Sequence, residues 1–382
     1  MENSILKNLI YLCLIICLFC HCGPKQEIIE KHVEDGVEVV VNHLEPYRIE
    51  GEPVQLYLEE KLTIDTESEL SAEKGLTNIY YFDVDSDGNI YFGNNVPQEN
   101  YILKFDRNGN FVMAFGRKGQ GPGELLEPMF PVITNQDEVL IMDEGKRKLF
   151  FFTKEGDYIK SIPQDATTIA LFPLENGNYL LISVIYTYPS DYLLFSLSGS
   201  DFKQIKELER LIYPFKMRGK ENAITPGFFW SITKTNVCFG NEERGYEINV
   251  FDLEGNLVRK IKKGYRKVRI PDEYIKEKAE SMSEAFRQKS YFPEHFPPFQ
   301  CGFVDDKERI FVITNEKGSR PGEYVCDIFN PEGIFIARAS VTGIIDLGII
   351  FLPPIARKNL LYCIQEKENG YQKLVVYEMT WK

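Results

Sequence analysis

Histidine is scarce in this chain. Only four of its 382 residues are histidine, and beyond the first 22 residues only His32, His43 and His295 remain, none in a stretch that alternates like a β-strand. A metal centre built on histidine is therefore not expected. The chain also has no G-x-S-x-G sequence and no Gly-Lys-Ser/Thr phosphate loop, which removes the signatures of a serine hydrolase and of a P-loop.

Cysteine is unevenly used. Eight are present, but four lie within the first 22 residues, and the others show no C-x-x-C pair and no metal-ligand spacing. The others, Cys238, Cys301, Cys326 and Cys363, lie in or beside apolar runs, so we expect buried small hydrophobes. A disulfide between two of them stays open.

Positive charge is in deficit. The formal net charge of −13 repels phosphate backbones, so nucleic acid is not an expected partner. The composition is otherwise that of an ordinary globular protein, with 43% hydrophobic and 26% charged residues. Aromatic residues make up 13% of the chain, which favours β structure.

The first 22 residues differ from the rest. Leu9–Cys20 is a 12-residue apolar run, too short to span a bilayer comfortably but of the right length for a secretory signal. The run and the cysteines that end it resemble a bacterial lipoprotein signal, with Cys22 as the lipidated residue and Cys20 as the alternative. A cleaved signal and a retained anchor stay open. We expect a signal over 1–22, a polar tether over 23–50, and a protein anchored to a membrane in the periplasm or at the cell surface.

A repeat of two successive β-hairpins organises the chain after residue 75. In the first copy Tyr80–Val84 and Ile90–Phe92 flank the turn Ser86–Asn89, and Tyr101–Phe105 leads through the turn Asp106–Gly109. The second hairpin recurs with turn glycines at 109, 156, 199, 255 and 333, and a last copy at 373–379 has no second turn. The first hairpin recurs with turns at Glu175–Asn178, Lys234–Asn236, Asp306–Arg309 and Arg357–Asn359.

Six four-stranded units of roughly 40–50 residues are typical of a β-propeller. We therefore predict an all-β, six-bladed propeller over 51–382, with four-stranded blades. The last unit lacks a fourth strand, and residues 54–64 alternate as a strand does. This segment is predicted to pair into the last blade and close the ring.

The stretch from Asp85 to Pro128, with its DGNIY turn, its FD-x-x-G turn and its "FGRKGQGPGELLEP" connection, resembles an NHL-type repeat. More narrowly, it resembles the six-bladed propeller lipoproteins of bacteria. The pattern covers residues 54–380, closely in the first blade and in outline afterwards. This resemblance implies export to the cell envelope and implies no reaction.

The glycine-rich stretch Gly116–Gly123 is interpreted as the connection between blades one and two. Pro122 and Pro128 lie where a dinucleotide-binding helix would have to start, and hairpins flank the stretch on both sides. Glycine supplies positive φ and proline fixes the turn, as a tight connection needs. Arg117 and Lys118 at its tip are candidates for contact with a ligand.

A calcium loop is the weaker of two interpretations of Asp83, Asp85 and Asp87. These residues match early positions of such a loop, but position 12 would be Asn94 and strands flank it. A hairpin turn rich in aspartate is the alternative. We expect no cofactor, with calcium left open.

Residues 264–300 form a predicted insertion between blades four and five. Pro271-Asp-Glu begins a helix well, and Ile275, Ala279, Met282 and Phe286 form one apolar stripe. We expect this helix to pack on the propeller.

The loops that join strands two and three, and those that join one blade to the next, leave the same face of a propeller. Long loops of a rigid scaffold commonly carry binding. The candidate ligand-binding residues on this loop-rich face are Arg117, Lys118, Asn94, Asp143, Arg147 and Tyr186.

The sequence thus predicts a propeller that binds an unidentified ligand or envelope protein through its loop-rich face. The alternative is an envelope hydrolase or lyase with a carboxylate-bound metal in the channel. Because no catalytic residue can be named, an enzyme is the less favoured of the two.

Overall fold

The computed structural model describes residues 29–79, 81–93, 100–165, 167–187, 191–212, 220–342, 354–367 and 369–382. The chain divides into two compact units, residues 1–30 and residues 31–382. The second unit holds the propeller sheets. No helix in the described part is long and apolar enough to cross a membrane.

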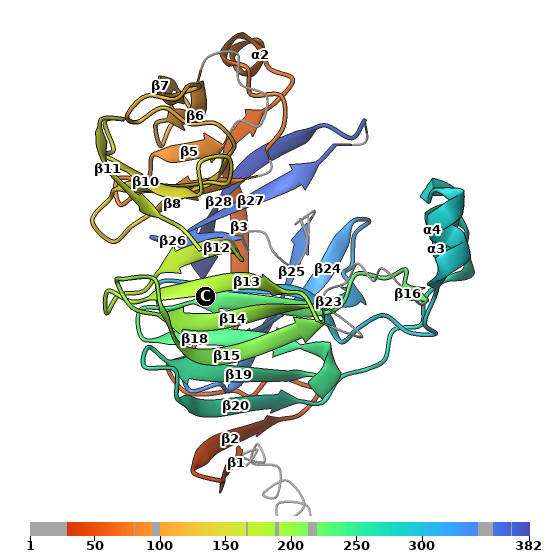
Figure 1. Cartoon of the computed structure of the whole chain (residues 1–382). Coiled ribbons are helices and arrows are strands. Elements are labelled where there is room, and N and C mark those ends of the chain that lie inside the picture. The colour runs from red at the N-terminus through yellow and green to blue at the C-terminus, as the bar shows by residue number, and fades with distance from the viewer. Residues whose placement is uncertain are drawn as a thin grey trace, which may run out of the picture. The chain divides into compact units, whose positions relative to one another are not determined.

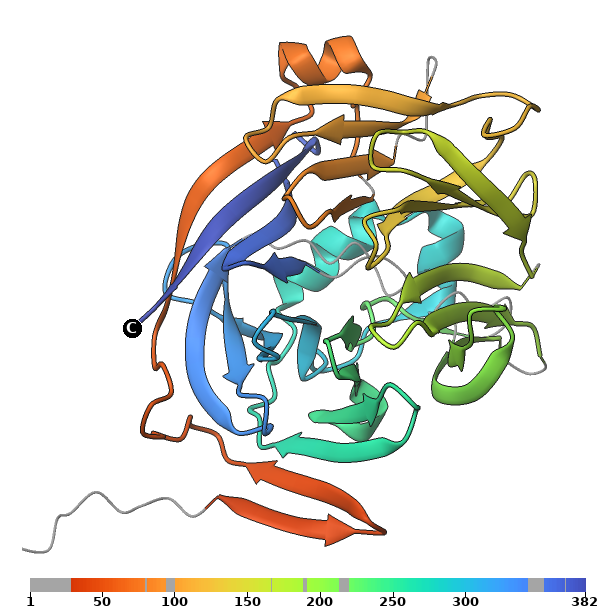
Figure 2. The same ribbon diagram turned by 90° about the vertical axis from the view of Figure 1, so that its left-hand side faces the viewer.

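Six antiparallel sheets of four blade strands each are arranged in a ring, seen face-on in Figure 2. Blade one is β4 (Phe82–Val84), β5 (Ile90–Gly93), β6 (Asn100–Phe105) and β7 (Phe111–Arg117); blade two is β8 (Pro128–Ile133), β9 (Val139–Asp143), β10 (Lys148–Phe152) and β11 (Tyr158–Pro163). Blade three is β12 (Thr168–Pro173), β13 (Tyr179–Ile185), β14 (Tyr192–Ser198) and β15 (Gln204–Ile212); blade four is β17 (Phe228–Ile232), β18 (Asn236–Asn241), β19 (Glu247–Asp252) and β20 (Leu257–Lys263). Blade five is β22 (Phe299–Val304), β23 (Ile310–Lys317), β24 (Glu323–Phe329) and β25 (Phe335–Thr342); blade six is β26 (Ile355–Arg357), β27 (Leu360–Glu366) and β28 (Gln372–Trp381), completed by β3 (Leu56–Asp65). The predicted fold class is confirmed.

The ring is closed by an N-terminal strand, as predicted. β3 pairs antiparallel with β28, with Ile64 opposite Leu374 and Leu56 opposite Trp381. Ile64 and Leu374 are buried, so the closing pair contributes to the core as well as to the hydrogen-bond ladder. A short helix, α2 (Glu69–Lys74), follows β3 and is capped by the Ser68 side chain.

The turns follow the chemistry that the repeat implied. Asp106 accepts hydrogen bonds at Oδ1 from the amides of Asn108 and Asn110, and Gly109 has a φ of 81°. Gly156, Gly255 and Gly333 also have positive φ, whereas in blade three it is Phe202, not Gly199, that does. Four of the five predicted turn glycines therefore meet a backbone need that a side chain would strain.

The predicted tether over 23–50 is wrong for residues 30–42. β1 (Glu30–Glu34) and β2 (Val37–Asn42) extend the sheet of blade four, because β2 pairs in parallel with β20. Val39 and Val40 are fully buried. Asn42 donates through Nδ2 to the Gly333 carbonyl (3.0 Å) and accepts at Oδ1 from the Phe335 amide (2.8 Å). The segment therefore ties blade four to blade five.

The predicted helical insertion is present, but its packing differs from the expectation. α3 (Asp272–Ser281) and α4 (Glu284–Lys289) have no buried residue, and the stripe of Ile275, Ala279, Met282 and Phe286 is only half-buried. Figure 1 shows the two helices standing clear of the blades. Two short parallel strands, β16 (Glu221–Asn222) and β21 (Ser290–Tyr291), lie at their base. The other helical turn is η1 (Glu242–Arg244).

A buried charge cluster joins blades four and five. Asp327 of β24 accepts from the Tyr246 hydroxyl (2.9 Å), lies 3.1 Å from Lys263 Nζ, and accepts from Arg338 Nε (2.9 Å). The side chains of Asp327 and Lys263 are 0% and 1% exposed. Burial lowers the pKa of the Lys263 ammonium, and the Asp327 carboxylate opposes that fall. Mutual pairing therefore offsets the desolvation of these charges.

Cys238, Cys301, Cys326 and Cys363 are all buried, as expected of small hydrophobes. Burial raises the pKa of the Cys238 and Cys363 thiols to about 12, which keeps them protonated and unreactive at neutral pH.

Candidate functional site

The first strand of each blade ends at one opening of the central channel. These strands are β4, β8, β12, β17, β22 and β26, and each turns tightly into its neighbour within the blade. The residues at their ends and in the turns after them surround a cavity of about 460 Å³. All six blades contribute to it.

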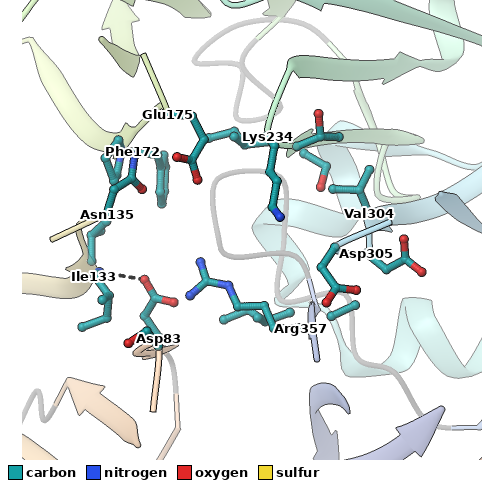
Figure 3. Close-up of a pocket in the computed structure, with 18 of the residues that line it drawn as sticks. Asp83, Ile133, Asn135, Phe172, Glu175, Lys234, Val304, Asp305 and Arg357 are labelled. Carbon is teal, nitrogen blue, oxygen red and sulfur yellow. Dashed lines mark hydrogen bonds between the residues drawn. The ribbon is translucent and has the colours of Figure 1, made fainter. Parts of the chain in front are cut away.

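The polar side chains around this cavity come from positions far apart in the sequence. They are Asp83 and Ser86 of blade one, Asn135 and Asp137 of blade two, Glu175 of blade three, Lys234 of blade four, Asp305 and Asp306 of blade five, and Arg357 and Lys358 of blade six. Figure 3 labels Asp83, Asn135, Glu175, Lys234, Asp305 and Arg357 and shows these side chains around a common space. Phe172, Trp230, Ile133 and Val304 supply apolar wall between them. We call this cavity the channel-mouth pocket.

Asp83 is a buried carboxyl residue of the pocket, with 7% of its surface exposed. Its Oδ2 accepts from the Ile133 amide of blade two (2.8 Å), and its Oδ1 accepts from the Val84 amide (2.7 Å). Burial raises the pKa of the Asp83 carboxyl, while the charge of Arg357 and these two amides oppose the rise. The carboxylate thus links blades one and two at the pocket wall.

Three cationic residues in the described part of the chain line the pocket, and one of them, Lys358, donates from its ammonium to the Ser86 carbonyl. Arg357, at the end of β26, donates from one terminal nitrogen to the Val84 carbonyl (2.6 Å), and its guanidinium faces Asp83. Lys234, in the turn after β17, points into the cavity from the other side. Its ammonium makes no hydrogen bond or ion pair with any residue that the structure describes.

Most carboxylates of the pocket are already engaged by neighbouring donors. Asp305 forms a buried ion pair with Arg309 (2.6 Å). Asp137 accepts from the amide and hydroxyl of Ser86, and Asp306 accepts from the Lys358 amide (3.0 Å). Glu175 is the exception, since it is exposed and has no partner among the described side chains.

The glycine-rich connection is held by bonds within itself. The Gly119 amide donates to the Leu125 carbonyl, the Leu125 amide to the Arg117 carbonyl, and the Gly121 amide to Glu124 Oε2 (2.8 Å). Because the Gly119 and Gly121 amides are bonded within the connection, they are not free to cradle a phosphate. Its interpretation as a connection between blades is confirmed.

The residues predicted from the loop-rich face lie at the other ends of the strands. Arg117 ends β7, Lys118 follows it in a bridge to Leu125, Arg147 is exposed in the turn before β10, and Tyr186 is 76% exposed after β13. Asn94 lies outside the described residues. Asp143 is fully buried, and its carboxylate accepts from the amides of Leu126, Glu127 and Lys146.

The three aspartates of the possible calcium loop have separate protein partners. Asp85 accepts from the amides of Asp87 and Asn89 and from the Tyr91 hydroxyl, and Asp87 pairs with Lys154 (2.9 Å). These contacts and those of Asp83 are hydrogen bonds and ion pairs within a hairpin turn and between neighbouring blades. In the described part of the chain no three His, Cys, Asp or Glu side chains are grouped to hold a metal ion.

The pocket residues that were not predicted for a site include Lys234, Glu175, Asn135 and Arg357. The signal that could have found three of them was present, because Glu175, Lys234 and Arg357 each begin a turn of the repeated first hairpin. Superposing the repeats would have placed these turns at one end of the channel.

Known proteins share this fold. Residues 74–216 match the family DUF5128, described as a 6-bladed beta-propeller. A presumed exported protein from Bacteroides fragilis is 12% identical with a TM-score of 0.51, covering 90% of this chain and 99% of its own. A DUF4221-family protein from Bacteroides vulgatus is 13% identical with a TM-score of 0.49, covering 87% of this chain and 100% of its own. No curated protein matches the chain. These likenesses concern the fold alone.

Proposed function

We propose that this protein is an exported, lipid-anchored propeller that binds a small polar molecule in the channel-mouth pocket. The observation that supports this most directly is the convergence of side chains from all six blades on one cavity of about 460 Å³. Small-molecule sites are typically concave, of about 300–1,000 Å³, with apolar walls and a few convergent polar groups. The pocket has each of these features.

The rigidity of the scaffold favours the same conclusion. The pocket residues lie at strand ends or in tight turns, and Asp83 and Arg357 bridge neighbouring blades through backbone groups. The rings of Phe172 and Trp230 pack at a centroid distance of 4.5 Å, with their planes tilted by 44°, in the wall between blades three and four. Sites on such elements are preorganised, so less ordering free energy is lost when a ligand binds.

Export and lipidation are proposed from the N-terminal sequence. The Leu9–Cys20 run followed by Cys22 has the form of a lipoprotein signal. A structural neighbour is itself described as a presumed exported protein. A propeller held at a membrane by a lipid would present its pocket to the solutes of the envelope.

The loop-rich face remains the candidate surface for an envelope protein partner. The exposure of Tyr186 and Arg147 supports a surface role for that face. The hydrolase or lyase with a carboxylate-bound metal is not favoured by any described residue, since the carboxylates of Asp83, Asp305 and Asp306 each have protein donors.

The test is ligand-induced thermal stabilisation of the protein from residue 23 onward. The probes are D-glucose, D-glucuronate, L-glutamate and L-lysine. A binder present at 100 times its Kd should stabilise the protein by about 2.7 kcal/mol. Glu175→Trp should abolish the shift by filling the pocket, because Glu175 has no described partner whose loss would disturb the fold.

The matched control is Glu254→Trp, an exposed position in an outer turn of blade four. This variant should keep the full thermal shift. A shift that survives Glu175→Trp but disappears in Tyr186→Ala would place binding on the loop-rich face instead.

A further inference from the structure

The acidic and basic side chains of the channel-mouth pocket differ in how far they are already bonded to other protein groups. Asp83, Asp137, Asp305 and Asp306 accept hydrogen bonds from donors in the pocket wall or behind it. Their negative charge is therefore partly compensated within the protein. Lys234 has no described partner, and Arg357 uses one nitrogen on the Val84 carbonyl, which leaves its other N–H groups for a ligand.

Lys234 and Arg357 come from blades four and six, so they approach the cavity from different directions. Figure 3 shows the ammonium and the guanidinium both turned into the same space, with Glu175 at the edge beside Lys234. The Asp83 carboxylate already offsets part of the Arg357 charge, whereas the Lys234 ammonium has no described partner, and the two positive charges repel each other across the cavity. An anion would relieve that repulsion and satisfy the free donors.

We propose that the pocket binds a small carboxylate, held between Arg357 and Lys234, whose hydroxyl or ammonium hydrogens are accepted by Glu175. This inference rests on the proposed function and adds the ligand's chemical class. The planar fork of arginine fits a carboxylate through two parallel hydrogen bonds, and lysine adds a point charge. A sugar acid and an amino acid both carry this combination of groups.

The experiment is isothermal titration calorimetry at low ionic strength with D-glucuronate, its neutral match D-glucose, and L-glutamate. We expect one of the carboxylates to bind and D-glucose to bind at least tenfold more weakly. Lys234→Gln should weaken the carboxylate about tenfold or more, since a hydrogen bond to a charged group contributes about 1.5–3 kcal/mol. Lys276→Gln, the same change at an exposed position of α3, should have no effect.

Glu175→Gln distinguishes the two kinds of carboxylate ligand, a sugar acid and an amino acid. It removes one negative charge but keeps a hydrogen-bond acceptor, so D-glucuronate should bind as tightly or more tightly. L-glutamate should bind more weakly, because its ammonium loses a charged partner.

The carboxylate assignment is overturned if D-glucose binds as tightly as D-glucuronate, or if Lys234→Gln leaves carboxylate affinity unchanged while Glu175→Trp abolishes binding. In either case the pocket still binds a ligand and the proposed function stands. If none of the probes binds, or if all binding survives Glu175→Trp, both proposals fail.

Discussion

The Asp327 carboxylate holds three partners from two blades, which makes it the residue whose truncation should cost most. Asp327→Ala leaves Lys263 and Arg338 without their shared anion in a site where the lysine side chain is 1% exposed. Removing one partner of a buried ion pair costs about 3–5 kcal/mol. Urea unfolding should show a loss of that size.

Lys263→Met serves as the comparison. Tyr246 and Arg338 still bind the Asp327 carboxylate in this variant, and methionine fills much of the same apolar space beside Tyr246 and Phe335. The loss of stability should therefore be clearly smaller than for Asp327→Ala. Equal losses would contradict the view that Asp327 is the centre of the cluster.

Residue patterns explain why the turns were predictable and the pocket was not. Asp106 and Gly109 determine their turn through bonds and φ values within five residues, so the sequence reveals them. The contacts of Asp83 could not be predicted in this way. Its hydrogen bond to the Ile133 amide spans 50 residues of sequence, and its charge partner Arg357 lies still farther along the chain. Only the curvature of the ring brings these groups together.

Among the elements, β3 closes the ring by completing the sheet of blade six. A chain that starts at residue 75 lacks β3 and leaves the edge of β28 unpaired, so it should be unfolded or insoluble. A chain that starts at residue 29 keeps every described strand and should stay folded. Circular dichroism and size-exclusion chromatography separate the two outcomes, and a folded, monomeric product from residue 75 would contradict closure by β3.

The α3–α4 pair should be dispensable for folding. Neither helix has a buried residue, so replacing residues 272–289 with a short Gly-Ser linker removes little burial from the propeller. The melting temperature should change by no more than about 2 °C, because about 1 kcal/mol produces a shift of roughly 2–4 °C in a domain of 150–250 residues and a smaller one in a larger domain. A larger fall in a thermal melt would show that the helices support the ring after all.

For the molecule as a whole, the lipid anchor is the prediction that decides where the pocket works. Cys22→Ser should abolish incorporation of labelled palmitate and release the protein from the membrane fraction, whereas Cys20→Ser should do neither. The reverse result would identify Cys20 as the modified residue. If both variants still incorporate labelled palmitate, neither Cys20 nor Cys22 is identified as the lipidated residue, and the lipoprotein assignment is contradicted.

Local patterns along the chain were enough to specify the fold class, the number of blades, the turns and the strand that closes the ring, because each depends on alternation and turn chemistry that the chain repeats. Folding in three dimensions determined the features that have no local signal. It paired Val37–Asn42 in parallel with a strand more than 200 residues away, and it left the helical insertion unburied. It also brought Lys234 and Arg357 to one cavity, because six separately coded blades must curve into a ring before their inner strand ends can meet.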